Sequence, residues 1–151
     1  MKSQPHLHKI VVPGNHDLIL ARQQDARDLL APVTLLSDSE VTIHGVRFYG
    51  VGWGSKPAIP AGVDVLISHT PPFGVLDNGL GSRELREAVL AARPTVHVFG
   101  HIHGCRGHQT LGVTHFYNAV IDARAPKTAL AASSHRVTLP TARPWVHELE
   151  K

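Results

Sequence analysis

The sequence predicts an α/β fold in which short buried strands form a sheet that helices flank. Short apolar runs rich in β-branched residues are typical of buried strands, and they occur at residues 9–12, 61–68 and 95–99. A proline, glycine or histidine ends each run abruptly, and a polar loop follows. Two segments with apolar residues at helical spacing, 18–31 and 83–92, alternate with these runs. This alternation is typical of an α/β protein.

The first third of the chain contains the first buried strand, a helix and three further short strands. Pro13 and Gly14 end the strand at 9–12, and Pro32 ends the helix at 18–31. We expect a tight turn between the last two of the short strands, which lie at 33–36, 40–44 and 46–51.

The second buried strand, 61–68, stops where the sequence continues with His69-Thr70-Pro71-Pro72. Ser82 is the predicted N-cap of the helix at 83–92, because its side chain can accept a hydrogen bond from the first helical turn. The third buried strand, 95–99, stops at Gly100. Strands and turns that close the sheet are expected at 115–120 and 137–149.

Composition predicts one globular domain, residues 1–151, that works in the cytoplasm. The chain is 42% hydrophobic and 18% charged, which is enough to bury a core. Its net charge of +3 is too small and too scattered to indicate specific nucleic-acid binding. The single cysteine allows no intramolecular disulfide or thiolate metal cage, and no segment is apolar enough to span a membrane.

Histidine is the unusual component, with 12 residues in the chain. Imidazoles in such number suggest metal binding or proton transfer, because few other functions need them. The alternative is composition drift, in which the rings lie scattered on the surface. We expect this surface placement for eight of them: His6, His8, His44, His97, His108, His115, His135 and His147.

The other four histidines follow the ends of the three buried strands. The first strand is followed by Asn15 and His16, the second by His69, and the third by His101 and His103. Parallel strands would bring these tips to one edge of a sheet, and the i, i+2 spacing in the third loop points both rings to one side. Imidazoles and one amide oxygen suit divalent zinc, manganese, iron or nickel. Asp17 is expected to shape its loop through backbone hydrogen bonds.

Three motifs in this order resemble those of the calcineurin-like metallophosphoesterases: GNHD at 14–17, SHTPP at 68–72 and GHIH at 100–103. The stretch HKIVVPGNHD also looks like the branch that contains the metallophosphoesterase-domain proteins related to brain protein 239. The resemblance covers most of the chain. It implies a β-sandwich flanked by helices, two divalent metal ions at the edge of the double sheet, and hydrolysis of phosphomonoesters or phosphodiesters by a metal-activated water.

The resemblance also implies a role for each site residue. Asn15, His69 and His101 would bind one metal ion, and His103 would bind the other. His16 would face the phosphate, where it stabilises the transition state or protonates the leaving group. The substrate would be a small phosphoester, and the branch suggests a nucleotide.

The chain departs from the family pattern before GNHD. Family members have a D-x-H motif and a Gly-Asp segment upstream of GNHD, and the aspartate of the second segment bridges the two metal ions. In this sequence GNHD begins at residue 14. The resemblance therefore implies an N-terminally truncated fold without the bridging carboxylate. His6 and His8 are no replacement, because an extended chain would place them roughly 20 Å from the site. Asp77 and Asp122 are candidate replacements for the missing metal ligands only by elimination. A partner chain could supply ligands, and a homodimer could cover the exposed sheet edge.

Two functions from different classes therefore remain open. The first is a metal-dependent phosphoesterase. The second is a truncated relative that binds one metal ion, or none, and has weak catalysis or none. The residues favour the first through the three motifs and the second through the number of ligands.

Overall fold

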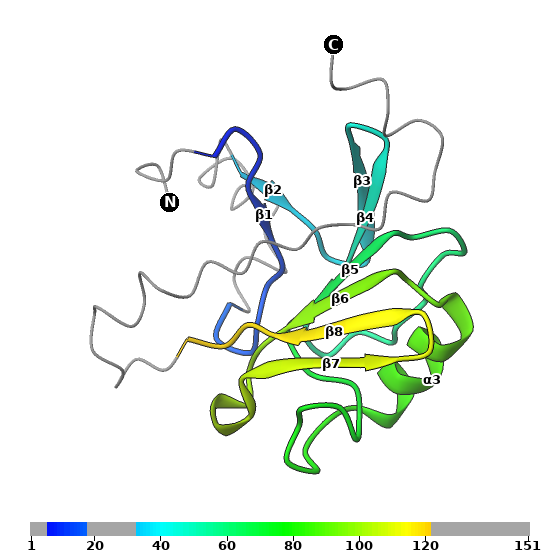
Figure 1. Cartoon of the computed structure of the whole chain (residues 1–151). Helices are drawn as coiled ribbons and strands as arrows, with labels where there is room; N and C mark the ends of the chain where they lie inside the picture. Colours follow the sequence, from blue (N-terminus) through cyan, green and yellow to red (C-terminus); the bar gives the residue numbers. More distant parts are fainter. Residues whose placement is uncertain (1–5, 18–32, 122–151) are drawn as a thin grey trace.

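The computed structural model describes residues 6–17 and 33–121, whose strands form two sheets (Figure 1). The smaller sheet pairs β1 (Ile10–Val11) with β2 (Thr34–Leu35) in parallel. These are the strands predicted at 9–12 and 33–36, each shortened to its central residues. The predicted helix at 18–31 and the predicted closing segment at 137–149 lie outside the described residues.

The larger sheet has six strands in the order β3-β4-β5-β6-β8-β7. Its centre is parallel and joins β4 (Val46–Val51), β5 (Val65–Ser68), β6 (Val96–Phe99) and β8 (Thr114–Asn118). Each edge is an antiparallel hairpin, formed by β3 (Ser39–Ile43) with β4 and by β7 (Gly107–Leu111) with β8. The predicted α/β class is confirmed.

One part of the predicted arrangement is wrong. The three buried strands were expected to be parallel, with their tips at one edge of a sheet, yet β1 pairs with β2 in the smaller sheet, while β5 and β6 are neighbours in the larger one. The loops after all three strands nevertheless meet, because the C-terminal end of β1 points toward the ends of β5 and β6 (Figure 1). The polar site therefore lies between the two sheets.

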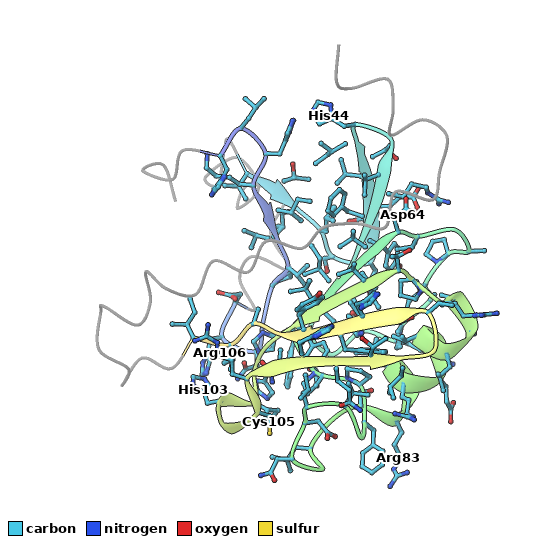
Figure 2. All side chains as sticks on the ribbon, viewed as in Figure 1. His44, Asp64, Arg83, His103, Cys105 and Arg106 are labelled. Carbon is cyan, nitrogen blue, oxygen red and sulfur yellow. The ribbon has the colours of Figure 1, made fainter. Side chains whose placement is uncertain are left out.

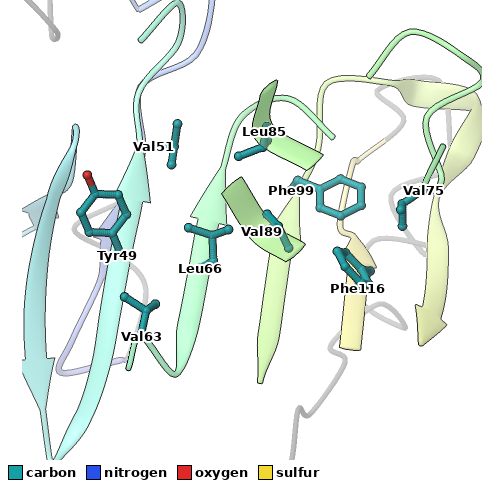
Figure 3. Close-up of a cluster of buried hydrophobic side chains, with 9 residues drawn as sticks. All are labelled: Tyr49, Val51, Val63, Leu66, Val75, Leu85, Val89, Phe99 and Phe116. Atoms are coloured by element: carbon teal, nitrogen blue, oxygen red, sulfur yellow. The ribbon is translucent and has the colours of Figure 1, made fainter. Parts of the chain in front are cut away.

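The hydrophobic core lies between the larger sheet and helix α3 (Arg83–Ala92). Figure 3 shows Leu85 and Val89 of this helix above Leu66, Phe99 and Phe116 of the sheet. The side chain of Ser82 accepts a hydrogen bond from the amide of Leu85, which confirms the predicted N-cap. The helix ends at Arg93, whose backbone is left-handed with φ of 52°.

The strand β7 was not predicted. Its signal is the alternation of exposed and half-buried side chains from Gly107 to Leu111, followed by Gly112 with a positive φ of 60° in the turn. The hairpin turn at His44 and Gly45 is confirmed, since both residues have positive φ, at 49° and 77°.

The surface placement predicted for His97 is wrong. This residue lies on β6 and is 0% exposed, because its side chain shares a face with the core residues Phe99 and Phe116, whose rings contact it. The other described histidines of that group agree with the prediction: His6, His8, His44 and His108 are exposed and His115 is half-buried. The surface prediction failed because Phe99 at i+2 on the same strand and Phe116 on the neighbouring strand β8 determine the environment of the ring.

Among the described residues, no helix is long and apolar enough to cross a bilayer. Helix α3 has only ten residues.

Candidate metal centre

The GNHD loop forms a closed turn at the end of β1. The amide of Asp17 donates to the carbonyl oxygen of Gly14 at 3.0 Å, and the amide of Gly14 donates to Oδ2 of Asp17 at 3.0 Å. The prediction that Asp17 shapes the loop is therefore confirmed. These two hydrogen bonds fix the backbone on both sides of Asn15 and His16.

Gly14 lets the ring of His69 approach the loop closely. A Cβ atom at this position would lie 2.6 Å from both Cε1 and Nδ1 of His69. Any other residue would therefore collide with the imidazole, and a rigid ring backed by β5 cannot move away cheaply. The glycine of GNHD is therefore needed for the close approach of His69.

Three side chains meet where the loops after β1, β5 and β6 converge. Nε2 of His69 lies 2.9 Å from Oδ1 of Asn15 and 3.0 Å from Nδ1 of His101. Two ligands bound at about 2.1 Å and 90° apart on one ion lie about 3.0 Å from each other, so this spacing fits neighbouring ligands of a metal. The donor set, one amide oxygen and two imidazoles, also suits a divalent ion of intermediate softness.

The ring of His69 is kept neutral by its surroundings. Partial burial lowers the pKa of His69, the nearby His101 and, more weakly, His16 lower it further, and the carboxylate of Asp17 acts in the opposite direction. Metals bind the neutral imidazole, so a lowered pKa makes this nitrogen available as a ligand near neutral pH.

His101 has an unusual backbone conformation, with φ of +68°. The left-handed region costs a residue with a Cβ on the order of 1–3 kcal/mol, and such strain is often found at functional sites. The loop is held there by two backbone hydrogen bonds, from the amide of Gly100 to the carbonyl oxygen of His69 at 3.2 Å and from the amide of Ile102 to the carbonyl oxygen of Gly100 at 2.8 Å.

Trp53 covers one side of the cluster and was missed by the sequence reasoning. Its ring centroid lies 5.5 Å from that of His69 and 5.1 Å from that of His101. The amide of Trp53 also donates to the carbonyl oxygen of Pro13, which joins the loop after β4 to the loop after β1. The available signal was its position, since Gly52-Trp53-Gly54 directly follows a strand that runs parallel to β5.

A buried hydrogen-bond relay supports the loop that contains His69. The hydroxyl of Ser68 donates to the carbonyl oxygen of Thr70 at 2.7 Å, so its oxygen accepts from Nε2 of His97 at 2.8 Å. This assigns the proton of the imidazole to Nε2, while the buried Nδ1 has no hydrogen-bond partner. Complete burial lowers the pKa of His97 to about 3, so the ring is neutral.

The two remaining predicted site residues lie at the surface. His16 is exposed on the GNHD turn, close enough to His69 to influence its pKa. His103 is exposed at the start of the short helix η1 (His103–Cys105), and no hydrogen bond or ring contact joins it to Asn15 or His69 within residues 6–17 and 33–121. Figure 2 shows His103 beside Cys105 and Arg106.

The carboxylates considered as replacement ligands lie elsewhere. Oδ2 of Asp77 accepts hydrogen bonds from the amides of Gly74 and Gly81, which organise the loop before α3 and hold the pKa of Asp77 below its usual value against the effect of burial. Asp122 lies outside the described residues. No group of three or more histidine, cysteine, aspartate or glutamate residues with a geometry for metal binding occurs in the part of the chain that the structure describes.

A cleft of about 370 Å³ opens beside His69 and Trp53. The loop after β4, the loop after β5 and the start of α3 form its walls. The cleft therefore adjoins the candidate ligands through His69.

The fold matches that of metallophosphoesterase-type proteins. The chain is a homologue of the UPF0046 and metallophosphoesterase domain-containing proteins, and its fold is of the calcineurin-like phosphoesterase type, which confirms the resemblance of the three motifs. It is 35% identical over 162 residues to UPF0046 protein C25E10.12 of Caenorhabditis elegans, in an alignment that covers 79% of this chain and 58% of the relative. It is 32% identical over 168 residues to human metallophosphoesterase domain-containing protein 1, covering 79% and 52%. The chain thus spans about half the length of these relatives. No family model matches the sequence.

Two solved structures are similar in fold. One aligns with a TM-score of 0.57 and 20% identity, over 74% of this chain and 56% of the other. The crystal structure of TT1561 of Thermus thermophilus aligns with a TM-score of 0.50 and 13% identity, over 74% and 61%. At these identities the likeness concerns the fold alone.

Proposed function

We propose that this protein is a metal-dependent phosphoesterase that hydrolyses phosphomonoester or phosphodiester bonds. The observation that supports this proposal best is the position of His69 Nε2, which lies 2.9 Å from Asn15 Oδ1 and 3.0 Å from His101 Nδ1. Names of the homologues, which include metallophosphoesterase domain-containing protein 1, agree with it. These three residues come from three separate loops, so their convergence is a property of the fold rather than of one motif.

Asn15, His69 and His101 would hold one divalent ion, with zinc, manganese, iron and nickel as candidates. A bound ion would lower the pKa of a water molecule and offset charge on the phosphoryl oxygens. His103, exposed at the start of η1, would contribute to a second ion if the remaining ligands come from elsewhere. Gly14 of the loop after β1 and Trp53 of the loop after β4 both lie close to the ring of His69.

His16 is the proposed catalytic residue. Its ring is exposed on the turn that also contains Asn15, so a phosphoester bound at the cluster would lie within reach of it. An imidazole titrates near neutral pH, which allows it to stabilise the phosphoryl group as a cation or to donate a proton to the leaving group.

The second candidate function is metal binding without catalysis. The specific observation in its favour is the small number of strong ligands, because the third donor of the cluster is an amide and the nearby carboxylate of Asp17 is hydrogen-bonded to Gly14. A single ion held by neutral donors keeps its full charge. It would bind anions yet lack the carboxylate that usually fixes a second ion.

Metal stoichiometry separates these two functions. Untagged full chain is loaded with manganese or zinc, desalted and analysed for metal per chain, together with His101→Ala and the control His108→Ala, which removes an exposed histidine of β7. We expect one ion per chain or more, lost in His101→Ala and kept in the control. Unchanged metal content in His101→Ala would reject the assigned cluster. Hydrolysis of a phosphoester by the loaded protein then favours the enzyme, and its absence favours the second function.

The proposed setting is the cytoplasm, with a small phosphoester as substrate and a nucleotide as one candidate, and without membrane or specific nucleic-acid binding. A homodimer is also proposed. Among the described strands β1 pairs only with β2, so its other edge can accept a strand from a second copy. A monomer in light scattering at micromolar concentration would contradict the dimer.

A further inference from the structure

The cleft beside the cluster has a chemical character different from that of a phosphate pocket. Of the residues that line it, His69 and Glu84 alone have ionisable side chains. A phosphate would need cations or several free amides, and this cleft offers it neither lysine nor arginine. The phosphoryl group of a substrate is therefore expected at the His69 end, and the rest of the cleft is free for another part of the molecule.

Two large apolar side chains stand at the rim of this cleft from different loops. Trp53 is 39% exposed after β4, and Leu80 is 67% exposed in the loop before α3. Exposed apolar side chains on both sides of a cleft are typical of a ligand site, since each would otherwise remain in water without compensation. Val51 and Leu85, which belong to the hydrophobic cluster drawn in Figure 3, also line the cleft.

Two polar groups of the lining, those of Ser55 and Glu84, favour hydrogen-bond donors on the ligand. The carboxylate of Glu84 is exposed in the first turn of α3 and can only accept hydrogen bonds when it is ionised. The hydroxyl of Ser55 already donates to the carbonyl oxygen of Gly52 at 2.6 Å, which leaves its oxygen as an acceptor. An anionic group in this cleft would face the carboxylate and lose affinity.

We propose that this cleft binds the organic group of the phosphoester, with Trp53 and Leu80 as apolar walls and Glu84 as the acceptor that selects a flat, uncharged or cationic group with N–H donors. The inference rests on the proposed function, because it assigns the phosphoryl group to the cluster at His69. It makes Leu80 and Glu84 specificity-determining residues, although neither contacts the three candidate ligands. An aromatic amine attached to the phosphoryl group has the required shape and donors.

The test uses non-hydrolysable probes, so that it reports binding without turnover. Metal-loaded full chain is titrated by calorimetry with 4-aminophenylphosphonate, 4-carboxyphenylphosphonate and methylphosphonate. We expect the aminophenyl probe to bind at least about tenfold more tightly than either of the others, because stacking and the acceptor both favour it. Equal affinity of the three probes, or no binding of any, would overturn the proposal.

Variants assign the effect to the named residues. Glu84→Gln should reduce the preference for the amino over the carboxyl probe by about tenfold, and Leu80→Ala should weaken both aromatic probes by several fold. The controls are Glu87→Gln and Leu90→Ala, which change an exposed glutamate and an exposed leucine of the same helix outside the cleft. Loss of preference in Glu87→Gln, or its survival in Glu84→Gln, would contradict the assignment.

The outcome for the cleft is separate from the outcome for catalysis. Selective binding without hydrolysis of 4-aminophenyl phosphate would uphold the cleft and reject the enzyme. Hydrolysis without selectivity among the corresponding phosphate esters would uphold the enzyme and reject the cleft.

Discussion

The buried imidazole of His97 should make the protein sensitive to mild acid. Its folded-state pKa is about 3, against 6.5 for an ordinary histidine, because complete burial disfavours the charged ring. Below pH 6.5 the unfolded chain takes up a proton at this position and the folded protein does not. The stabilising contribution is therefore complete above pH 6.5 and is lost as the pH falls toward 3.

The size of this effect follows from the two pKa values. Each pH unit between them lowers the free energy of unfolding by about 1.4 kcal/mol, so the contribution of His97 should be about 2 kcal/mol smaller at pH 5 than at pH 7. The variant His97→Gln removes the titration. Its amide nitrogen can still donate to the oxygen of Ser68, which keeps the relay that supports the His69 loop.

Urea unfolding at pH 7 and pH 5, in the presence of a chelator, measures the difference. The wild type should lose about 2 kcal/mol more than His97→Gln over this interval, whatever the cost of the substitution itself at pH 7. All other groups titrate in both proteins, so they cancel in the comparison. The same pH dependence in both proteins would show that His97 is protonated in the folded state or is hydrated there, and would refute the reasoning.

Three further predictions concern the cluster. Gly14→Ala should lower metal affinity at least about tenfold, because its Cβ would collide with the ring of His69. The control Gly104→Ala, with open space around its Cβ, should leave the affinity unchanged. Calorimetric titration with zinc compares the two variants, and equal affinities would exclude the steric role of Gly14. In the presence of a chelator, the free energy of unfolding of His101→Gly should exceed that of His101→Ala by about 1 kcal/mol, because glycine relieves the strain at φ of +68°. A higher stability of His101→Ala in urea unfolding would contradict this prediction. His16→Ala should keep its metal in elemental analysis while hydrolysis falls about 100-fold or more, and loss of the metal would make His16 a ligand instead.

The sequence was sufficient to predict the parts of the fold that depend on local signals. The proline and glycine after β1, the cap at Ser82 and the turn at His44 act within a few residues, and the structure has each of them at the predicted position. Strand boundaries differ by a few residues where a turn intrudes, as at Gly62, whose positive φ of 78° precedes the shortened β5.

Long-range features were less accessible. That β1 belongs to the smaller sheet depends on pairing across residues far apart in the chain, which no local pattern encodes. The convergence of Asn15, His69 and His101 was anticipated because all three follow strand ends, although the sheet assumed for them was wrong. Trp53 and the burial of His97 were missed because both involve contacts with segments far away in the chain, His101 for Trp53 and Phe116 of β8 for His97.

The location of the cluster between the two sheets has a consequence for folding. Asn15 and His69 are 54 residues apart in the chain, and His69 and His101 are 32 apart, so an ion held by all three would close two long loops at once. A ligand that binds only the folded form stabilises it by about 2.7 kcal/mol at 100 times its dissociation constant. The metal would then act as a cross-link that fastens the small sheet to the large one. Removing it should raise the unfolding rate and expose the junction between the sheets to proteases before the core around α3 is attacked.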